Sequence, residues 1–140
     1  FVAQAVDWIP ESLFQIVTAA FRHRGFSFVR VLQRCPEFVG NMFEPWVHDP
    51  QRMLMLTHEN GIQVSPALQK IYRNQQAHDP SDIHRAREIA SSEDPIPVGI
   101  LYRNPEVPCY EDLRRAGMLR TAGSIKTSLE AEFDKFTVWP

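Results

Sequence analysis

Residues 21–36 decide the fold of this chain, and they read FRHRGFSFVRVLQRCP. Three basic residues end an amphipathic segment, Gly25 follows them, and residues 26–32 are mostly β-branched or aromatic. Basic side chains are favourable at a helix C-terminus, and glycine readily takes the left-handed conformation that ends a helix. The stretch therefore predicts a helix that ends near Gly25 and a strand over 26–32. The nearly continuous apolar run is typical of a strand that is covered on both faces of a parallel sheet.

The segments on either side extend this pattern. Pro10 suits the first position of a helix, and Glu11 lies in its first turn, where a carboxylate is favourable. The core-facing stripe of this helix consists of Leu13, Ile16, Val17, Ala20 and Phe21. Residues 1–4 are β-prone, so the order is strand, helix, strand, as in a βαβ unit. A helix over 80–91, a strand over 96–102 and a helix over 110–116 are predicted further along. The expected fold class is α/β with a parallel sheet.

Two segments interrupt this regularity. Residues 36–78 are rich in proline and bulky apolar side chains, and we expect an irregular interface or active-site arm with a short helix over 66–76. Residues 118–140 form a C-terminal tail, and its amphipathic stripe should dock on another subunit. The stripe consists of Ile125, Leu129, Phe133 and Phe136. The predicted organisation has four parts: 1–35, 36–78, 79–117 and 118–140.

Composition narrows the function classes. The chain has 140 residues, 44% of them hydrophobic, and a net charge of −2, which suits one globular domain. Its 15 basic residues form no run, so no nucleic-acid partner is expected. No apolar stretch is long enough for a membrane span, so no membrane partner is expected. Two cysteines suit a reducing cytoplasm better than a disulfide framework. The first residues show neither a start Met nor a signal peptide, so we expect the chain to begin within a longer polypeptide.

Several residues could carry chemistry, but few form a pattern. Cys35 follows the predicted strand and Cys109 lies at a predicted helix start, and no CxxC pair occurs. His48, His58, His78 and His84 lack the spacing of zinc ligands, and His23 suits the helix C-terminus. Several carboxylates could pair as acid and base, but the sequence gives no geometry to test such a pairing. Several arginines are also candidates, but a solvent-exposed surface position is the simpler interpretation of each. These candidates are Glu37, Glu44, Asp49 and Glu59, with Arg34, Arg52 and Arg73.

Three segments together resemble the β subunit of the 2-oxoacid:ferredoxin oxidoreductases. Residues 1–4 (FVAQ) are similar to the step that opens the second half of that subunit. Residues 21–36 resemble its helix, glycine, strand and cysteine in the same order. Residues 94–103 (DPIPVGILYR) resemble its last strand. The chain is thus similar to the C-terminal half of a β subunit, and the expected fold is the parallel-sheet half of a thiamine-diphosphate-binding module.

The resemblance implies an enzyme that acts only as part of a complex. The family decarboxylates a 2-oxoacid on thiamine diphosphate with Mg²⁺, forms an acyl-CoA and passes electrons through [4Fe–4S] clusters to ferredoxin. The implied partners are the remainder of the β subunit, the α subunit, a second αβ unit, ferredoxin, the 2-oxoacid and CoA. The diphosphate motif, Gly-Asp-Gly, does not occur here. Cys35 matches the fourth ligand of the proximal cluster, and Arg34 would offset cluster charge. No catalytic residue is assigned, and Cys109 has no implied role.

The sequence departs from the family after Cys35, where residues 36–41 read PEFVGN and the family asparagine is displaced to Asn41. The Arg34-Cys35-Pro36 variant favours 2-oxoglutarate over pyruvate as the substrate. Two alternatives stay open. One is a non-catalytic interaction subunit that keeps the scaffold without a cluster, and the other is a free-standing zinc module.

Overall fold

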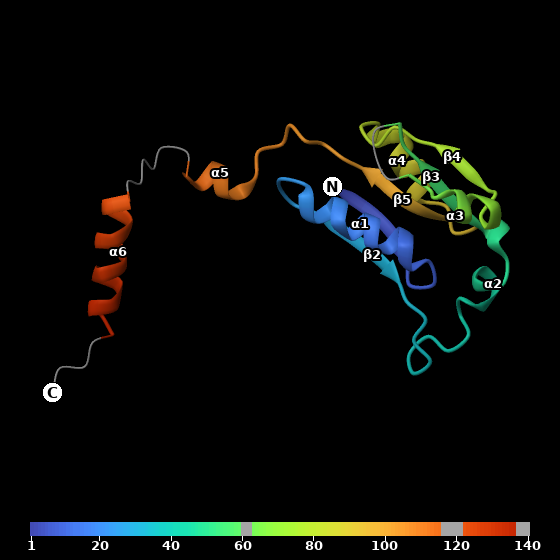
Figure 1. Cartoon of the computed structure of the whole chain (residues 1–140), viewed down its shortest axis with the longest axis horizontal. Helices are drawn as coiled ribbons and strands as arrows, with labels where there is room; N and C mark the ends of the chain where they lie inside the picture. Colours follow the sequence, from blue (N-terminus) through green and yellow to red (C-terminus); the bar gives the residue numbers. More distant parts are fainter. Residues whose placement is uncertain (60–62, 116–121, 137–140) are drawn as a thin grey trace. The chain divides into compact units, whose positions relative to one another are not determined.

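The computed structural model describes residues 1–59, 63–115 and 122–136 (Figure 1). These residues form two compact units, Phe1–Pro108 and Cys109–Pro140. The second unit contains helices α5 (Tyr110–Arg115) and α6 (Ala122–Asp134). The predicted helix at 110–116 is confirmed but groups with the tail, not with residues 79–108. Its predicted stop at Gly117 lies outside the described residues. No described helix is both long and apolar enough to cross a membrane.

The first unit contains a five-stranded sheet with helices, which confirms the predicted α/β class. Its strands are β1 (Val2–Val6), β2 (Phe28–Leu32), β3 (Met53–Thr57), β4 (Gln75–Ala77) and β5 (Ile96–Tyr102). The order across the sheet is β2-β1-β5-β3-β4. All pairings are parallel except that of β1 with β5, which is antiparallel. The sheet therefore consists of a β1–β2 pair and a β3–β4–β5 group that run in opposite directions.

Helices cover both faces of the sheet. Helix α1 (Pro10–Arg22) places Ile16 in a core with Val98 and Ile100 of β5. Helix α4 (Ile83–Ala90) places Ile89 in a second core with Leu101 of β5 and Leu56 of β3. Successive residues of a strand point to opposite faces, so the two cores lie on opposite sides of β5. Both helices were predicted, and Gly25 after α1 has the expected positive φ of 124°.

The prediction for residues 36–78 was only partly right. Residues 33–43 are irregular and α2 (Glu44–Val47) is a single turn, but strands β3 and β4 also lie within this segment. The predicted helix at 66–76 is α3 (Pro66–Ile71), and its expected last turn is strand β4 instead. The segment therefore supplies two strands of the sheet, because its buried run MLML pairs with β5, 43 residues away in sequence.

The expected burial of β2 was wrong. Phe28 and Val31 are exposed, and β2 pairs only with β1 in the described sheet. The apolar run predicted the strand correctly but not its place, because β-branched and aromatic residues are favoured on edge strands too.

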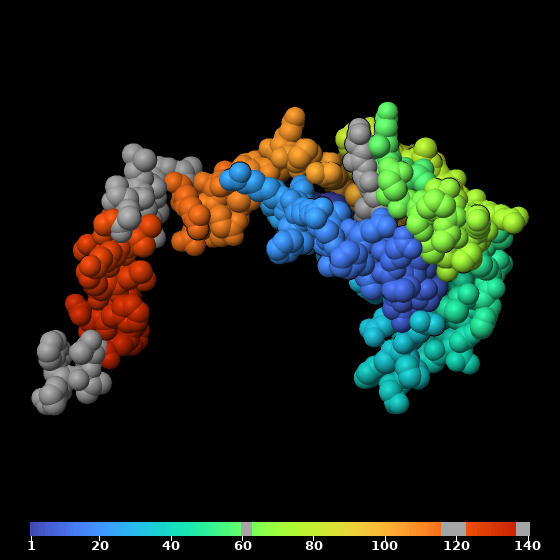
Figure 2. All heavy atoms as spheres, viewed as in Figure 1, coloured from blue at the N-terminus to red at the C-terminus, as the bar shows by residue number. Residues whose placement is uncertain are grey.

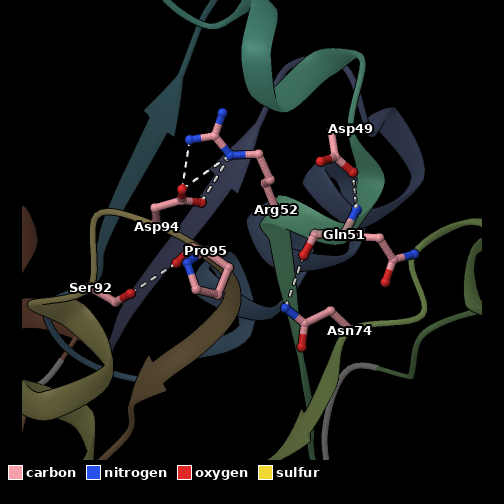
Figure 3. A network of polar contacts seen from close by, with 7 residues as sticks. All are labelled: Asp49, Gln51, Arg52, Asn74, Ser92, Asp94 and Pro95. Atoms are coloured by element: carbon pink, nitrogen blue, oxygen red, sulfur yellow. Dashed lines mark hydrogen bonds and ion pairs between the residues drawn. The ribbon is translucent and has the colours of Figure 1, made fainter.

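Polar contacts pin the amino-terminal ends of β3, β4 and β5 (Figure 3). Arg52, just before β3, binds Asp94, just before β5, through two nitrogens, with Nη2 2.6 Å from Oδ2. Asn74, just before β4, donates to the Gln51 carbonyl at 3.1 Å. The Arg52 guanidinium also lies 4.8 Å from the Trp46 ring centroid. The starts of the three parallel strands are thus tied to one another by side chains.

Two buried histidines tie the opposite ends of the same strands. His58, after β3, donates from Nδ1 to the His78 carbonyl at 2.9 Å and accepts at Nε2 from the Ile100 amide at 3.2 Å. His78, after β4, donates from Nε2 to the Leu101 carbonyl at 2.7 Å. The side chains of His58 and His78 are only 5% and 6% exposed. An imidazole that accepts a backbone hydrogen bond must be neutral, so this arrangement requires neutral His58.

The first testable prediction concerns Gly99 in the middle of β5. Its φ is 141°, and a Cβ there would lie 2.7 Å from Leu56 Cβ. Gly99→Ala should therefore destabilise the contact between β5 and β3 by about 2–4 kcal/mol. Hydrogen exchange of peptides from both strands should then rise at least about tenfold. The matched control is Gly40→Ala, where φ is also positive but nothing lies within 4 Å of the added carbon. Unchanged exchange in the Gly99 variant would contradict the prediction.

The second prediction concerns pH. Burial is the main cause that lowers the pKa of His58, so the unfolded chain takes up this proton at a higher pH than the folded chain. Stability should be constant above about pH 6.5 and should fall as pH drops from there towards the lowered folded pKa. The measurement is the thermal unfolding midpoint between about pH 7.5 and pH 5.

The control for the pH prediction is the exposed His84 on α4. His58→Gln should lower the midpoint at neutral pH and weaken its decline in acid, because the titrating ring is gone. His84→Gln should keep the wild-type decline. An unaltered acid response in the His58 variant would show that other groups cause it.

Candidate functional site

Cys35 lies in the loop that leaves the sheet after β2. The last backbone bond at this edge runs from the Asp7 amide to the Leu32 carbonyl at 3.1 Å, three residues before the cysteine. Cys35 is a free thiol of intermediate exposure, and its carbonyl accepts from the Val39 amide at 2.9 Å. Strand β2 ends at Leu32, so the sheet does not hold this sulfur. The loop, not the sheet, sets its position.

Contacts from the end of β1 hold the start of this loop. Arg34 Nε donates to Asp7 Oδ1 at 3.1 Å, and its guanidinium lies 5.9 Å from the Trp8 ring centroid. Because β1 and β2 are parallel, their carboxyl ends meet at one edge, which brings Asp7 and Trp8 beside Arg34 and Cys35. Arg34 is thus a partly exposed, paired cation next to the thiol in sequence.

The aromatic residues of the loop divide into two groups. Phe43 packs between Trp8 and Trp46, with ring centroids 5.7 and 6.3 Å away. Phe38 is 90% exposed, and the loop stands out from the first unit (Figure 2, light blue to cyan). One part of the predicted interface arm is therefore packed on its own chain, and its tip is free for an interface.

Several of the other predicted candidates are engaged in local contacts and do not gather at a second site. Arg52 pairs with Asp94, Arg73 donates to the Lys70 carbonyl, and His48 pairs with Glu44. Asp49 caps the turn at Gln51. In residues 1–59, 63–115 and 122–136 no group of three or more His, Cys, Asp or Glu side chains could hold a metal ion. Cys109 begins the second unit and is likewise a free thiol of intermediate exposure.

A cavity at the opposite edge was missed by sequence reasoning. It measures about 730 Å³ and lies where the parallel strands β3, β4 and β5 end. Its walls include Thr57, His58, Glu59, Ala77, His78, Asp79, Pro80, Ser81, Ile100, Arg103 and Pro105. Hydrogen bonds from the Ser81 amide and hydroxyl lower the pKa of Asp79. The sequence signal was the run His-Asp-Pro-Ser at 78–81, which follows β4 directly. Ligands of open α/β sheets bind outside the carboxyl ends of strands.

The donor set at the Cys35 edge fits one ligand of an iron–sulfur cluster. A [4Fe–4S] cluster takes four thiolates, and the two cysteines of this chain lie in separate units. One thiol could supply at most one of the four ligands of such a cluster. The Gly-Asp-Gly motif expected for binding thiamine diphosphate and Mg²⁺ does not occur in this sequence.

Comparisons with known proteins agree with the resemblance. Residues 68–116 match the family of C-terminal regions of the pyruvate ferredoxin oxidoreductase beta subunit. The chain is 27% identical over 112 residues to "2-oxoacid:ferredoxin oxidoreductase 2, subunit beta" of Aeropyrum pernix, an alignment that covers 80% of this chain. It is 26% identical over 121 residues to "2-oxoacid:ferredoxin oxidoreductase subunit beta" of a Sulfolobus species, covering 83% of this chain.

The alignments cover most of this chain but only part of each relative. The matched regions span 34% and 35% of the two relatives, so this chain corresponds to about a third of their length. No solved structure is significantly similar to it. The matches support the resemblance that residues 1–4, 21–36 and 94–103 indicate. The chain is similar to the C-terminal part of the β subunit of 2-oxoacid:ferredoxin oxidoreductases.

Proposed function

We propose that this chain serves as the C-terminal part of a β subunit in a 2-oxoacid:ferredoxin oxidoreductase, and that it acts only within the assembled complex. The reaction releases the carboxyl group of a 2-oxoacid as CO₂, transfers the acyl group to the thiol of CoA, and passes two electrons singly to ferredoxin. 2-Oxoglutarate is proposed ahead of pyruvate. The observation that supports the proposal is that helix α1, Gly25, strand β2 and Cys35 follow one another in the order that the resemblance implies.

Within that complex Cys35 would donate one thiolate to the proximal [4Fe–4S] cluster, which supplies one-electron transfer when bound. The other ligands, thiamine diphosphate and Mg²⁺ would be held by the remainder of the β subunit and by the α subunit. Arg34 precedes Cys35 in sequence and would partly offset the negative charge of a cluster bound there. Asp7 and Trp8 restrain Arg34, so they would keep that charge at the start of the loop.

The free thiols of Cys35 and Cys109 suit a reducing compartment, and we propose the cytoplasm. The apolar side chains of helix α6 suit a contact with another subunit, because Ile125, Leu129 and Phe133 are exposed. The alternative of a non-catalytic interaction subunit shares this surface but needs no metal. The iron content of the complex distinguishes the two functions.

The third prediction tests Cys35 directly. In the assembled complex Cys35→Ser should lower the iron content or change the EPR signal of one reduced cluster, because serine is a poor substitute for a thiolate. Electron transfer to ferredoxin should slow more than decarboxylation, because the cluster acts after decarboxylation. Cys109→Ser is the matched control and should leave iron and spectrum unchanged. Full iron occupancy and an unaltered spectrum in the Cys35 variant would reduce Cys35 to a structural thiol.

The fourth prediction concerns residues 1–140 expressed alone. Phe14 and Phe21 on α1 are 73% and 88% exposed, and the outer edge of β2 is unpaired in the described sheet. Exposed apolar patches and open sheet edges promote association, so the isolated chain should be poorly soluble and inactive. Co-expression with the missing parts of the complex should rescue solubility. A monodisperse, active monomer on size-exclusion chromatography would refute this.

A further inference from the structure

A continuous row of side chains joins the loop after β2 to the edge of the sheet. Phe43 packs between two indole rings, and its ring centroid lies 5.7 Å from that of Trp8 and 6.3 Å from that of Trp46. The guanidinium of Arg34 lies 5.9 Å from the Trp8 centroid, and that of Arg52 lies 4.8 Å from the Trp46 centroid. Rings at these separations attract each other, and so do a guanidinium and a ring within about 6 Å. These five side chains form the aromatic row.

A carboxylate binds the arginine at each end of the aromatic row. Arg34 Nε donates to Asp7 Oδ1 at 3.1 Å. Arg52 Nη2 donates to Asp94 Oδ2 at 2.6 Å (Figure 3). Asp7 follows β1 and Asp94 precedes β5, and these strands are antiparallel neighbours, so both carboxylates lie at one edge of the sheet. The aromatic row is therefore anchored to that edge at both ends.

In the described part of the chain, no backbone hydrogen bond holds residues 33–43 against a strand. The last bond at this edge joins the Asp7 amide to the Leu32 carbonyl, and the bonds that follow are local, such as that from the Val39 amide to the Cys35 carbonyl at 2.9 Å. A surface loop of this kind opens readily unless side chains restrain it. The position of Cys35 therefore depends on side-chain contacts.

Trp8 contacts both ends of this loop. Arg34, at its start, precedes Cys35 in sequence, and Phe43 is its last residue before α2. Trp8 follows β1 closely and packs against the main core, so the first unit itself holds the indole in place. One side chain fixed to the sheet thus closes the loop at its start and at its end.

We propose that Trp8 is a positioning residue for the Cys35 thiol. It acts through Arg34 and Phe43, because a loop with both ends closed on one indole keeps its thiol in one place at the sheet edge. Groups that orient a metal ligand strengthen its binding to the metal. The proposal rests on the proposed function for one consequence, which is slower loss of iron from a cluster bound through Cys35. The effect on the loop itself needs no cluster.

The first measurement is hydrogen exchange of the assembled complex that contains this chain. Trp8→Leu removes the ring, so peptides from residues 33–43 should exchange at least about tenfold faster. Trp8→Phe keeps a ring at this position and should stay within about threefold of wild type. Phe38→Leu is the matched control and should exchange as wild type does, because this ring is on the same loop but is 90% exposed and outside the aromatic row. Unchanged exchange of β5 peptides shows that the fold is intact.

The second measurement follows the thiol. In the complex freed of iron by a chelator, Trp8→Leu should raise the rate at which iodoacetamide alkylates Cys35 at least about fivefold, because a loosened loop exposes a half-buried thiol. Cys109 is the internal reference and should react at its wild-type rate. In the iron-loaded complex the same variant should lose iron to the chelator at least about fivefold faster.

A second variant keeps the test decisive if Trp8→Leu fails to fold. Phe43→Leu removes the central ring of the aromatic row from the loop side and leaves the Trp8 indole packed on the core. It should give the same rises in exchange and alkylation.

Three results would overturn the proposal. The first is wild-type exchange of residues 33–43 in both the Trp8→Leu and the Phe43→Leu variants. The second is an equal rise in Phe38→Leu, which would show that the loop responds to the loss of any ring. The third is a loosened loop with unchanged alkylation of Cys35, which would leave the thiol positioned by other groups. Failure of the proposed function is distinguishable, because it appears as full iron content in Cys35→Ser and leaves exchange and alkylation in the Trp8 variants unaffected.

Discussion

The pairing of β5 with both of its neighbours is the constraint on which the first unit depends. β5 is buried on both faces and lies between β1 and β3 in the sheet. It contacts α1 through one set of alternating residues and α4 through the other. Gly99 permits this because Leu56 of β3 occupies the space where a side chain would stand. Larger residues at this one position would push the two halves of the sheet apart.

The antiparallel pairing of β1 with β5 determines at which edge of the sheet the candidate functional residues lie. It sends the carboxyl ends of β1 and β2 to one edge of the sheet and those of β3, β4 and β5 to the other. Cys35 and its Arg34–Asp7 pair follow the first set, and the His78 cavity follows the second. A parallel strand tends to place chemistry at its carboxyl end, so one sheet here offers two separate places for it.

The sequence correctly predicted the helices and strands whose ends are marked by proline or glycine. Pro10 and Gly25 bracket α1, and the β-branched run after Gly25 is β2. β3 was missed because MLML lacks β-branched residues, and β4 because QQA is polar and short. Both exist through pairing with distant strands, which no local window can detect. The resemblance to the family was recognisable from Cys35 and its surroundings, whereas the cavity is lined by His58, His78 and Arg103, which follow the ends of three separate strands.

The exposed apolar surface of this chain and the single thiol of Cys35 explain why we expect it to act together with other proteins. Its described surface leaves Phe14, Phe21 and Phe28 exposed, although its two cores are well filled. Exposed aromatic residues on a helix and an edge strand that adjoin each other are costly in water and favourable in an interface. The thiol of Cys35 is also incomplete by itself, because one thiolate cannot hold a cluster alone. Under the proposed function, the groups that complete both the surface and the cluster would come from protein that corresponds to the other two-thirds of the β-subunit relatives, or from other subunits.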